Sequence, residues 1–337
     1  MKLISKILFV FLICVNYCFA QTGDPKLLVR EGIELHNQKD YAGAIAKYKA
    51  ALAIDPDYDP GNYQLAFSLN AMGKGLDGIP YLEKVFKSTS ASTNLITGAY
   101  DLAGSIYDQQ HQPQKAIASY QAGIKANPAY QPLRYNLGLA YFRNRQYAEA
   151  EQAAIGAINI DPKQASSMRL YALVCFHQNK RVPALLGLCE FLVLEPNTAR
   201  SAEAYGNLQH ILQGGVLKPE PGEVRPHAIE AGVNAPNQVI AKAIAPFSRR
   251  RYASAGDLLS AQLSAIFIAL GTTPQEKYQF WHALADDFYK LSQTPNMPAF
   301  ARLISLSTPE SAKWAKTNVQ QMSDLDGWLK NNQPDYK

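Results

Sequence analysis

The chain has 337 residues, of which 47% are hydrophobic and 18% are charged, and its formal net charge is +5. This composition excludes a largely disordered chain, and the length suggests two folded bodies or one that grows by repetition. A net charge this small gives no reason to expect a nucleic-acid partner.

The first 20 residues have the pattern of a secretory signal peptide. Lys2 and Lys6 are basic, residues 7–15 are apolar, and the small Ala20 precedes Gln21. An uncleaved membrane anchor is the alternative, but it needs about 20 apolar residues, and Asn16 interrupts this shorter run. We therefore expect a cleaved signal peptide at 1–20, no stable membrane insertion afterwards, and a mature protein that is periplasmic, in the cell envelope or secreted.

Residues 25–58 predict a first pair of helices, over 25–37 and 41–54. Asp24 can cap the first helix, Pro25 suits its first position, and the residue before Pro56 is pushed out of the helical region. A second pair is predicted over 59–92. Its Gly73 and Gly75 crowd the turn and Pro80 falls in the first turn of the second helix, so we expect looser packing there. Ser88 to Ser92 hold a four-residue insertion.

Three regular pairs follow, over 97–130, 131–164 and 165–198, and a helix over 198–212 begins a partial sixth. Pro128, Pro162 and Pro196 are 34 residues apart, and Pro56 lies twice 34 plus four residues before Pro128. Small residues recur where the second helices must approach their neighbours; they are Ala44, Gly78, Ala116, Ala150 and Ala184.

The stretch from Gln131 to Pro162 shows the repeat most completely, with Leu137-Gly138, Tyr141, Tyr147 and Ala150 in order. This pattern and its period resemble the tetratricopeptide repeat (TPR) family. The resemblance implies an all-α TPR solenoid over 25–212, with about five repeats and a capping helix. It also implies a concave groove, lined by the first helix of each pair, that binds a protein or peptide partner. Carried over position by position, the groove residues are Val29, Ile33, Tyr63, Phe67, Asp101, Tyr135, Leu139, Phe142, Arg143, Arg169, Leu173 and Phe176. The same face also carries His36, Asn70, Ser105, Asp108 and His177.

The repeat pattern stops at a Pro- and Gly-rich linker, 213–236, and a C-terminal helical region, 237–332, follows. Its predicted helices are 237–247, 252–270, 274–292, 298–306 and 309–331. The pattern leaves open whether this region is a separate domain or continues the solenoid, although the apolar face of the last repeat needs a helical cap.

No catalytic, cofactor-binding or metal-binding motif is present, so the sequence predicts neither an enzyme nor a cofactor. Trp281, His282 and Asp286 form the densest polar and aromatic group of the C-terminal region, and their spacing is interpreted as a solvated helix face. Residues 249–251 are three arginines, which suit an acidic partner or lipid headgroups, or else the C-terminal end of a helix.

Two cysteines, Cys175 and Cys189, remain after signal cleavage. An oxidising compartment would allow a disulfide between them, and the sequence leaves this open while favouring a buried thiol at Cys175.

These observations predict a non-catalytic scaffold or adaptor that binds a partner peptide or helix in the groove. Two alternatives remain at this stage. The groove could be buried in a structural homo-oligomer, or the repeats could be a docking module for a small-ligand or enzymatic C-terminal domain.

Overall fold

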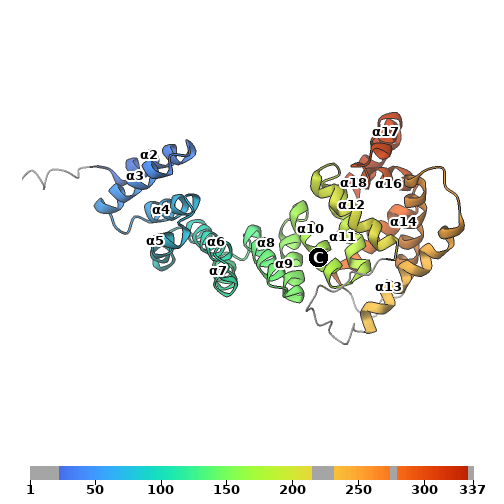
Figure 1. Cartoon of the computed structure of the whole chain (residues 1–337), viewed down its shortest axis with the longest axis horizontal. Helices are drawn as coiled ribbons and strands as arrows, with labels where there is room; N and C mark the ends of the chain where they lie inside the picture. Colours follow the sequence, from blue (N-terminus) through green and yellow to red (C-terminus); the bar gives the residue numbers. More distant parts are fainter. Residues whose placement is uncertain (1–22, 215–230, 274–278, 333–337) are drawn as a thin grey trace, which may run out of the picture. The chain divides into compact units, whose positions relative to one another are not determined.

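The computed structural model describes residues 23–214, 231–273 and 279–332, and all regular secondary structure in these ranges is helical (Figure 1). The predicted all-α fold is therefore confirmed. The chain divides into two compact units, unit 1 (residues 1–133) and unit 2 (residues 134–337). The predicted signal peptide and positions 215–230 of the predicted linker lie outside the described residues.

Unit 1 contains three helix pairs, and the bounds of the first pair are those predicted. Asp24 caps the first helix by accepting a hydrogen bond from the backbone N–H of Lys26, and Pro25 is its first residue. The helices are α2 (Pro25–Asn37), α3 (Tyr41–Ile54), α4 (Asp59–Ala71), α5 (Gly75–Lys87), α6 (Thr93–Gln109) and α7 (Pro113–Ala126).

Unit 2 continues the array and adds the C-terminal helices. The array helices are α8 (Gln131–Arg143), whose first turn spans the boundary between the units, α9 (Tyr147–Ile160), α10 (Ala165–His177), α11 (Arg181–Leu194) and α12 (Ala199–Leu212). The C-terminal helices are α13 (Ala231–Ile244), the 3-10 helix η1 (Ala245–Arg249), α14 (Ala255–Gly271), α15 (Phe280–Ser292), α16 (Met297–Ile304), α17 (Pro309–Thr317) and α18 (Val319–Asn331).

One residue with a left-handed backbone conformation lies in the turn within each pair, and another follows α12. Their φ angles lie between 54° and 76°. These residues are Lys39, Gly73, His111, Arg145, Asn179 and Gly214. Successive members are 34 or 35 residues apart, except for the step of 38 from Gly73 to His111. The period is thus present in the backbone itself, and the one long step contains the predicted insertion.

The second pair is not loosely packed, contrary to the prediction. Gly78 is buried against α4, where a Cβ atom would lie 3.0 Å from Cα of Ala66. The insertion is anchored as well, because the buried carboxylate of Asp59 accepts hydrogen bonds from the hydroxyls of Ser88 (2.7 Å) and Ser90 (2.9 Å). Pro80 lies beyond the first turn of α5, which begins at Gly75, and it faces solvent.

The predicted small residues of the second helices are all buried: Ala44, Gly78, Ala116, Ala150 and Ala184. Glycine on the first helices has a related role in unit 1. A Cβ atom at Gly32 or Gly104 would collide with the ring of Tyr48 or Tyr120, so these buried rings require the absence of a side chain opposite them.

Helix α11 is the centre of unit 2, because residues 182–192 are all buried. A helix that is apolar on every side needs partners on every side. It packs against α10 and α12 of the array and against α13, α15 and α16 of the C-terminal region, and one hydrophobic core includes residues of all of them. The C-terminal region therefore supplies the expected helical cap and shares a core with the last repeats.

Asn237 of α13 fixes this region to the turn between α10 and α11. Its side-chain oxygen accepts a hydrogen bond from the N–H of Arg181, and its amide nitrogen donates to the carbonyl of Asn179, both at 2.8 Å. One side chain thereby bonds two backbone groups of this turn.

The single helix predicted over 309–331 is wrong, because Asn318 divides it into α17 and α18. The side chains of Asn318 and Thr317 both donate to the carbonyl of Trp314, at 2.8 and 3.0 Å. The same carbonyl also accepts from the backbone N–H of Asn318, at 3.0 Å, and the backbone of Asn318 itself leaves the helical region.

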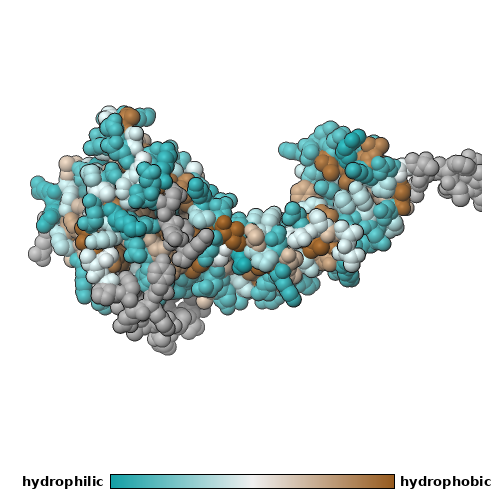
Figure 2. All heavy atoms as spheres, turned by 180° about the vertical axis from the view of Figure 1, so that it is seen from behind, coloured by the Kyte–Doolittle hydropathy of each residue, from teal (hydrophilic) through white to brown (hydrophobic). Residues whose placement is uncertain are grey.

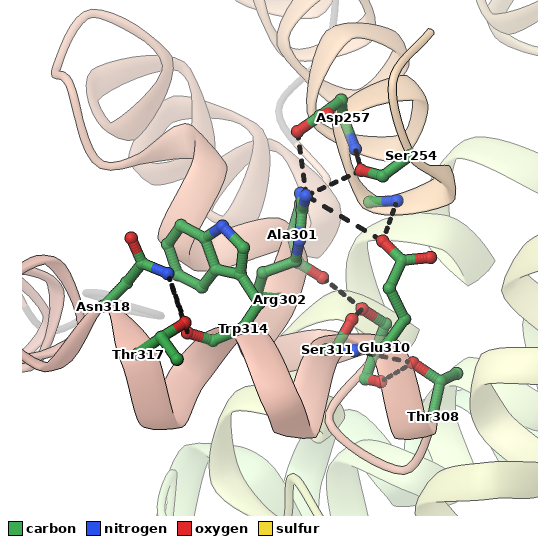
Figure 3. A network of polar contacts seen from close by, with 12 residues as sticks. Ser254, Asp257, Ala301, Arg302, Thr308, Glu310, Ser311, Trp314, Thr317 and Asn318 are labelled. Carbon is green, nitrogen blue, oxygen red and sulfur yellow. Dashed lines mark hydrogen bonds and ion pairs between the residues drawn. The ribbon is translucent and has the colours of Figure 1, made fainter.

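Arg302 of α16 connects three C-terminal helices, although only 2% of its side chain is exposed (Figure 3). Its Nη2 donates to Oδ1 of Asp257 and to the hydroxyl of Ser254, both at 2.8 Å, at the start of α14. Glu310 of α17 accepts from the N–H of Gly256 at 3.2 Å, and its carboxylate lies 3.9 Å from the guanidinium. The buried charge is thus compensated by carboxylates of two neighbouring helices.

Candidate binding surface

A stripe along each first helix is the candidate surface. The stripe consists of the fifth, ninth and twelfth residues of each first helix, which are α2, α4, α6, α8, α10 and α12. In α6, which is longer at its start, the count begins at Thr97. Residues at this spacing lie on one face of a helix. In unit 1 the stripe is Val29, Ile33, His36, Tyr63, Phe67, Asn70, Asp101, Ser105 and Asp108. In unit 2 it is Tyr135, Leu139, Phe142, Arg169, Leu173, Phe176, Glu203, Asn207 and His210.

In unit 1 the structure corrects one predicted groove residue. Val29 is 4% exposed and belongs to the core that α2 shares with α3 and α4, so its short side chain is not available to a partner. Ile33, Tyr63 and Asp101 are half-buried, and Phe67 is 41% exposed. Four of the five predicted residues of this unit therefore reach the surface.

Phe67 lies in a stack of rings from neighbouring helices. The imidazole of His36 in α2 stacks on it with ring centres 4.9 Å apart, and Tyr63 lies nearly parallel at 6.2 Å. The Nδ1 atom of His36 and the hydroxyl of Ser68 are 2.7 Å apart, a hydrogen bond that fixes the imidazole. Tyr41, the first residue of α3, closes the group edge-on at 5.0 Å from His36.

Burial raises the pKa of the Tyr63 phenol, and the negative charge of Asp101 raises it further. The phenol therefore stays neutral and can donate a hydrogen bond.

In unit 2 all the predicted groove residues are at least partly accessible. Arg143 is exposed, and Tyr135, Leu139, Phe142, Arg169, Leu173 and Phe176 are half-buried. Phe142 and Phe176 join a second cluster of rings. His177 lies 5.1 Å from Phe142, 5.7 Å from Tyr147 and 6.3 Å from Phe176, and His210 lies 5.9 Å from Phe176.

The predicted set omitted Tyr41, Tyr147 and His210, which complete these two clusters. Tyr41 and Tyr147 are the first residues of second helices, immediately after the turn that returns the chain beside the first helix. An aromatic residue at that position of the repeat is the sequence signal that could have identified them.

The two stripes differ in charge. Arg169 and Glu203 of unit 2 form an ion pair at 2.7 Å between equivalent positions of successive first helices, 34 residues apart. This contact confirms that the repeats stack in register there, and it neutralises both groups. The unit 1 stripe contains Asp101 and Asp108 and has no Lys or Arg at its nine positions.

Apolar residues on the face drawn in Figure 2 form small patches among hydrophilic ones, without one continuous apolar sheet. Along the two stripes defined above, a partner would meet rings and polar groups side by side. Large rings supply contact area at low entropy cost, and polar groups between them select the partner.

The group around Trp281 is not a solvated face, contrary to the prediction. Trp281 and His282 are 6% and 4% exposed, whereas Asp286 is exposed. The Nδ1 atom of His282 accepts a hydrogen bond from the N–H of Gln279 at 2.8 Å, so the imidazole caps the start of α15. Burial lowers the pKa of His282, which keeps the ring neutral in this role. These side chains therefore form part of a filled core.

Cys175 and Cys189 are both buried free thiols, and the predicted thiol at Cys175 is confirmed. Burial raises the pKa of both thiols above its ordinary value. Thiols in this state are poor nucleophiles, so they act as packing groups. The Arg250 and Arg251 side chains are exposed after η1, and the guanidinium of Arg250 lies 5.9 Å from the ring of Phe247.

Within the described ranges, no group of three or more His, Cys, Asp or Glu residues is placed to hold a metal ion. None of the helices in those ranges combines the length and the apolar character needed to cross a bilayer.

Comparison with protein families finds two matches, both described as tetratricopeptide repeat: residues 25–58 and residues 102–165. Neither match is to an enzyme family. No curated protein matches the chain significantly.

Solved structures similar to the chain include a crystal structure of MamA, with 25% identity, a TM-score of 0.46, and coverage of 52% of this chain and 94% of that one. YrrB, described as a TPR protein with an unusual peptide-binding site, has 17% identity, a TM-score of 0.45, and coverage of 53% and 90%. Pseudomonas aeruginosa pilF has 17% identity, a TM-score of 0.44, and coverage of 59% and 93%.

Proposed function

We propose that the protein is a non-catalytic scaffold that binds a partner peptide or helix along the stripe of its first helices. Residues 25–58 and 102–165 match tetratricopeptide-repeat families, which supports this proposal. The observation that carries this proposal is the placement of rings on the stripe. They come from successive first helices and are half-buried or exposed. His36 contacts Phe67, and Phe176 contacts His210, in advance of any partner. A surface that is already ordered loses less conformational entropy on binding than a flexible one.

The proposal includes the location of the protein, which we infer to be the periplasm, the cell envelope or the extracellular medium. It rests on the basic, apolar and small-residue order of residues 1–20. A partner would then be another exported or envelope protein.

The binding role is tested with the double variant Tyr135→Ala and Phe142→Ala in the mature chain, residues 21–337. Captured partner protein from an envelope extract, quantified by mass spectrometry, should fall by at least about tenfold, because central aromatic anchors carry most of an interface's energy. Ile160→Ala is the matched control, since Ile160 is 36% exposed but lies on the second helix α9.

The helical circular dichroism of both variants should equal that of the unchanged protein. Equal capture by the double variant would contradict the proposal. Light scattering on the same samples covers the alternative of a homo-oligomer: an assembly that dissociates in the double variant alone would assign the stripe to a second copy of the chain.

The alternative of an enzymatic C-terminal domain has less support. Its candidate residues Trp281 and His282 are core residues with the structural role of starting α15. Polar groups converging on an open pocket would be needed there, and these two side chains are buried instead.

A further inference from the structure

The segment between α13 and α14 concentrates positive charge on the surface of unit 2. Residues 231–256 contain Lys242 and the three consecutive arginines 249–251, and they contain no Asp or Glu. The side chains of Lys242, Arg250 and Arg251 are exposed. This part of the chain therefore carries charge of a single sign into the solvent.

These three exposed cations differ from three other arginines of the same unit. Arg169, Arg200 and Arg302 each form an ion pair with a carboxylate. Among the described residues, no carboxylate pairs with any of the three exposed cations. The next carboxylate along the chain, Asp257, already accepts a hydrogen bond from Arg302. The charge of the segment is therefore available to an anion from outside the chain.

Residues 247–252, which we call the basic loop, are closed by two rings. The ring centres of Phe247 and Tyr252 are 6.2 Å apart, and the backbone N–H of Arg250 donates to the carbonyl of Phe247 at 3.2 Å. The guanidinium of Arg250 lies 5.9 Å from the Phe247 ring. Both rings are half-buried, so the loop presents ring surface and exposed guanidinium groups together.

The end of a helix explains only part of this charge. Cations are favoured at the C-terminus of a helix, within its last turn. Arg250 is the C-cap of η1, a 3-10 helix of five residues, and its backbone is already extended, with φ -100° and ψ 144°. Arg251 follows the cap and lies outside the last turn. Stabilisation of the helix end therefore gives no reason for an arginine at this position.

The backbone of the loop favours a surface with many anionic groups over a single anion. The side chain that follows an extended residue points to the opposite side, so Arg250 and Arg251 do not converge on one carboxylate or phosphate. A lipid bilayer offers phosphate groups in every direction, and guanidinium groups bind phosphate through paired hydrogen bonds. Rings beside the cations suit the boundary between headgroups and acyl chains.

We propose that the basic loop is a peripheral contact site for a membrane surface that contains anionic lipid. Arg250 and Arg251 pair with headgroup phosphates, and the accessible ring surface of Phe247 and Tyr252 lies against the headgroups. The inference goes beyond the proposed function, because it concerns a different surface and holds whether or not the stripe binds a peptide. The attraction weakens as salt is added, since the charges are exposed.

Vesicle co-sedimentation tests the proposal with the chain 21–337, which lacks the predicted signal sequence and the affinity of that sequence for lipid. One set of vesicles is pure phosphatidylcholine, and the other contains roughly one third phosphatidylglycerol, an anionic lipid. At low salt the chain should bind the anionic vesicles at least about tenfold more tightly than the neutral ones, and added salt should reduce this ratio. Equal binding to both sets would overturn the proposal.

Three variants assign the binding to the loop. Arg250→Gln with Arg251→Gln should weaken binding to the anionic vesicles roughly tenfold or more. Arg250→Lys with Arg251→Lys keeps the charge and should retain most of the binding. Lys313→Gln with Lys316→Gln, on exposed positions of α17, removes the same net charge from the same unit and should leave binding unchanged. Circular dichroism checks that each variant is folded.

An acidic protein segment is the alternative ligand, and a labelled oligoglutamate peptide followed by fluorescence anisotropy covers it. If the chain binds this peptide through Arg250 and Arg251 but does not bind the vesicles, the loop is a site for an acidic protein, and the membrane assignment is overturned. An equal loss of vesicle binding in the α17 control would assign the effect to net charge and overturn it as well. None of these results alters partner capture by the stripe, so the inference and the proposed function fail independently.

Discussion

At the scale of single residues, the turn within each pair depends on one left-handed backbone position. Gly73 fills that position in the second pair, and Lys39 fills it in the first. Glycine adopts this conformation without cost, whereas a residue with a Cβ atom is strained there by roughly 1–2 kcal/mol. The turn therefore accommodates a lysine at a position where its backbone conformation favours glycine.

Lys39→Gly should raise the free energy of unfolding by up to about 1 kcal/mol, since relief of strain exceeds the added entropy of the unfolded chain. Gly73→Ala is the matched change in the opposite direction. A Cβ atom at Gly73 would meet no atom within 4 Å, so the substitution strains only the backbone. It should lower the free energy of unfolding by about 1 kcal/mol. Urea unfolding followed by circular dichroism measures both. Loss of stability in Lys39→Gly would show that the lysine contributes more than its strain costs.

At the scale of elements, the contact between α14, α16 and α17 is electrostatic as well as apolar. The guanidinium of Arg302 and the hydroxyl of Ser254 hold the pKa of Asp257 below its ordinary value of 3.8. A carboxyl group whose pKa is lower in the folded chain stabilises the fold above its unfolded pKa. That contribution is lost as the pH falls through the folded value.

Asp257→Asn should therefore lower the free energy of unfolding at pH 7 by on the order of 1 kcal/mol, a modest amount because the carboxylate is partly in water. The difference from the unchanged protein should shrink below about pH 4 and vanish when Asp257 is protonated. Thermal unfolding of both proteins from pH 7 to pH 2.5 measures this. A difference that stays constant over that range would mean that the charge of Asp257 does not contribute. Asp324→Asn, an exposed carboxyl on α18, is the control.

At the scale of the whole molecule, the two units carry chemically different stripes on the same repeat. Unit 1 presents rings with carboxylates, and unit 2 presents rings and leucines around a neutralised ion pair. In unit 2 the C-terminal helices also pack against the apolar sides of α11 that the array helices do not cover. Repetition thus supplies the scaffold, and substitutions at three positions of each first helix vary the surface.

We expect the exported protein to begin at Gln21. N-terminal sequencing of the protein from its native envelope fraction should give Gln-Thr-Gly-Asp, the residues after the small Ala20. Ala20→Arg should block processing and leave a heavier, membrane-associated precursor. A full-length protein in the cytosolic fraction, with Met1 retained, would contradict the proposed location.

Much of the fold could be predicted because its signals are local. Asp24 caps the first helix and Pro25 starts it, so two adjacent residues mark where that helix begins. The 34-residue period then gives the approximate bounds of the following helix pairs. The break at Asn318 was missed because no Gly or Pro marks it, and the weak helix formers Thr317, Asn318 and Val319 also occur inside helices. The structure shows that the backbone leaves the helical region at Asn318, where two side chains bond the carbonyl of Trp314.

The sequence by itself determined the paired helices, their period, and which helix face presents Phe67, Tyr135 and Phe142. Tertiary structure alone decided which neighbour covers each face: Val29 is enclosed between helices, and Trp281 and His282 join the core of unit 2. Periodicity specifies the direction of a side chain relative to its own helix axis. Burial depends on the helices that pack from elsewhere in the chain, and their positions follow from the sum of many distant contacts.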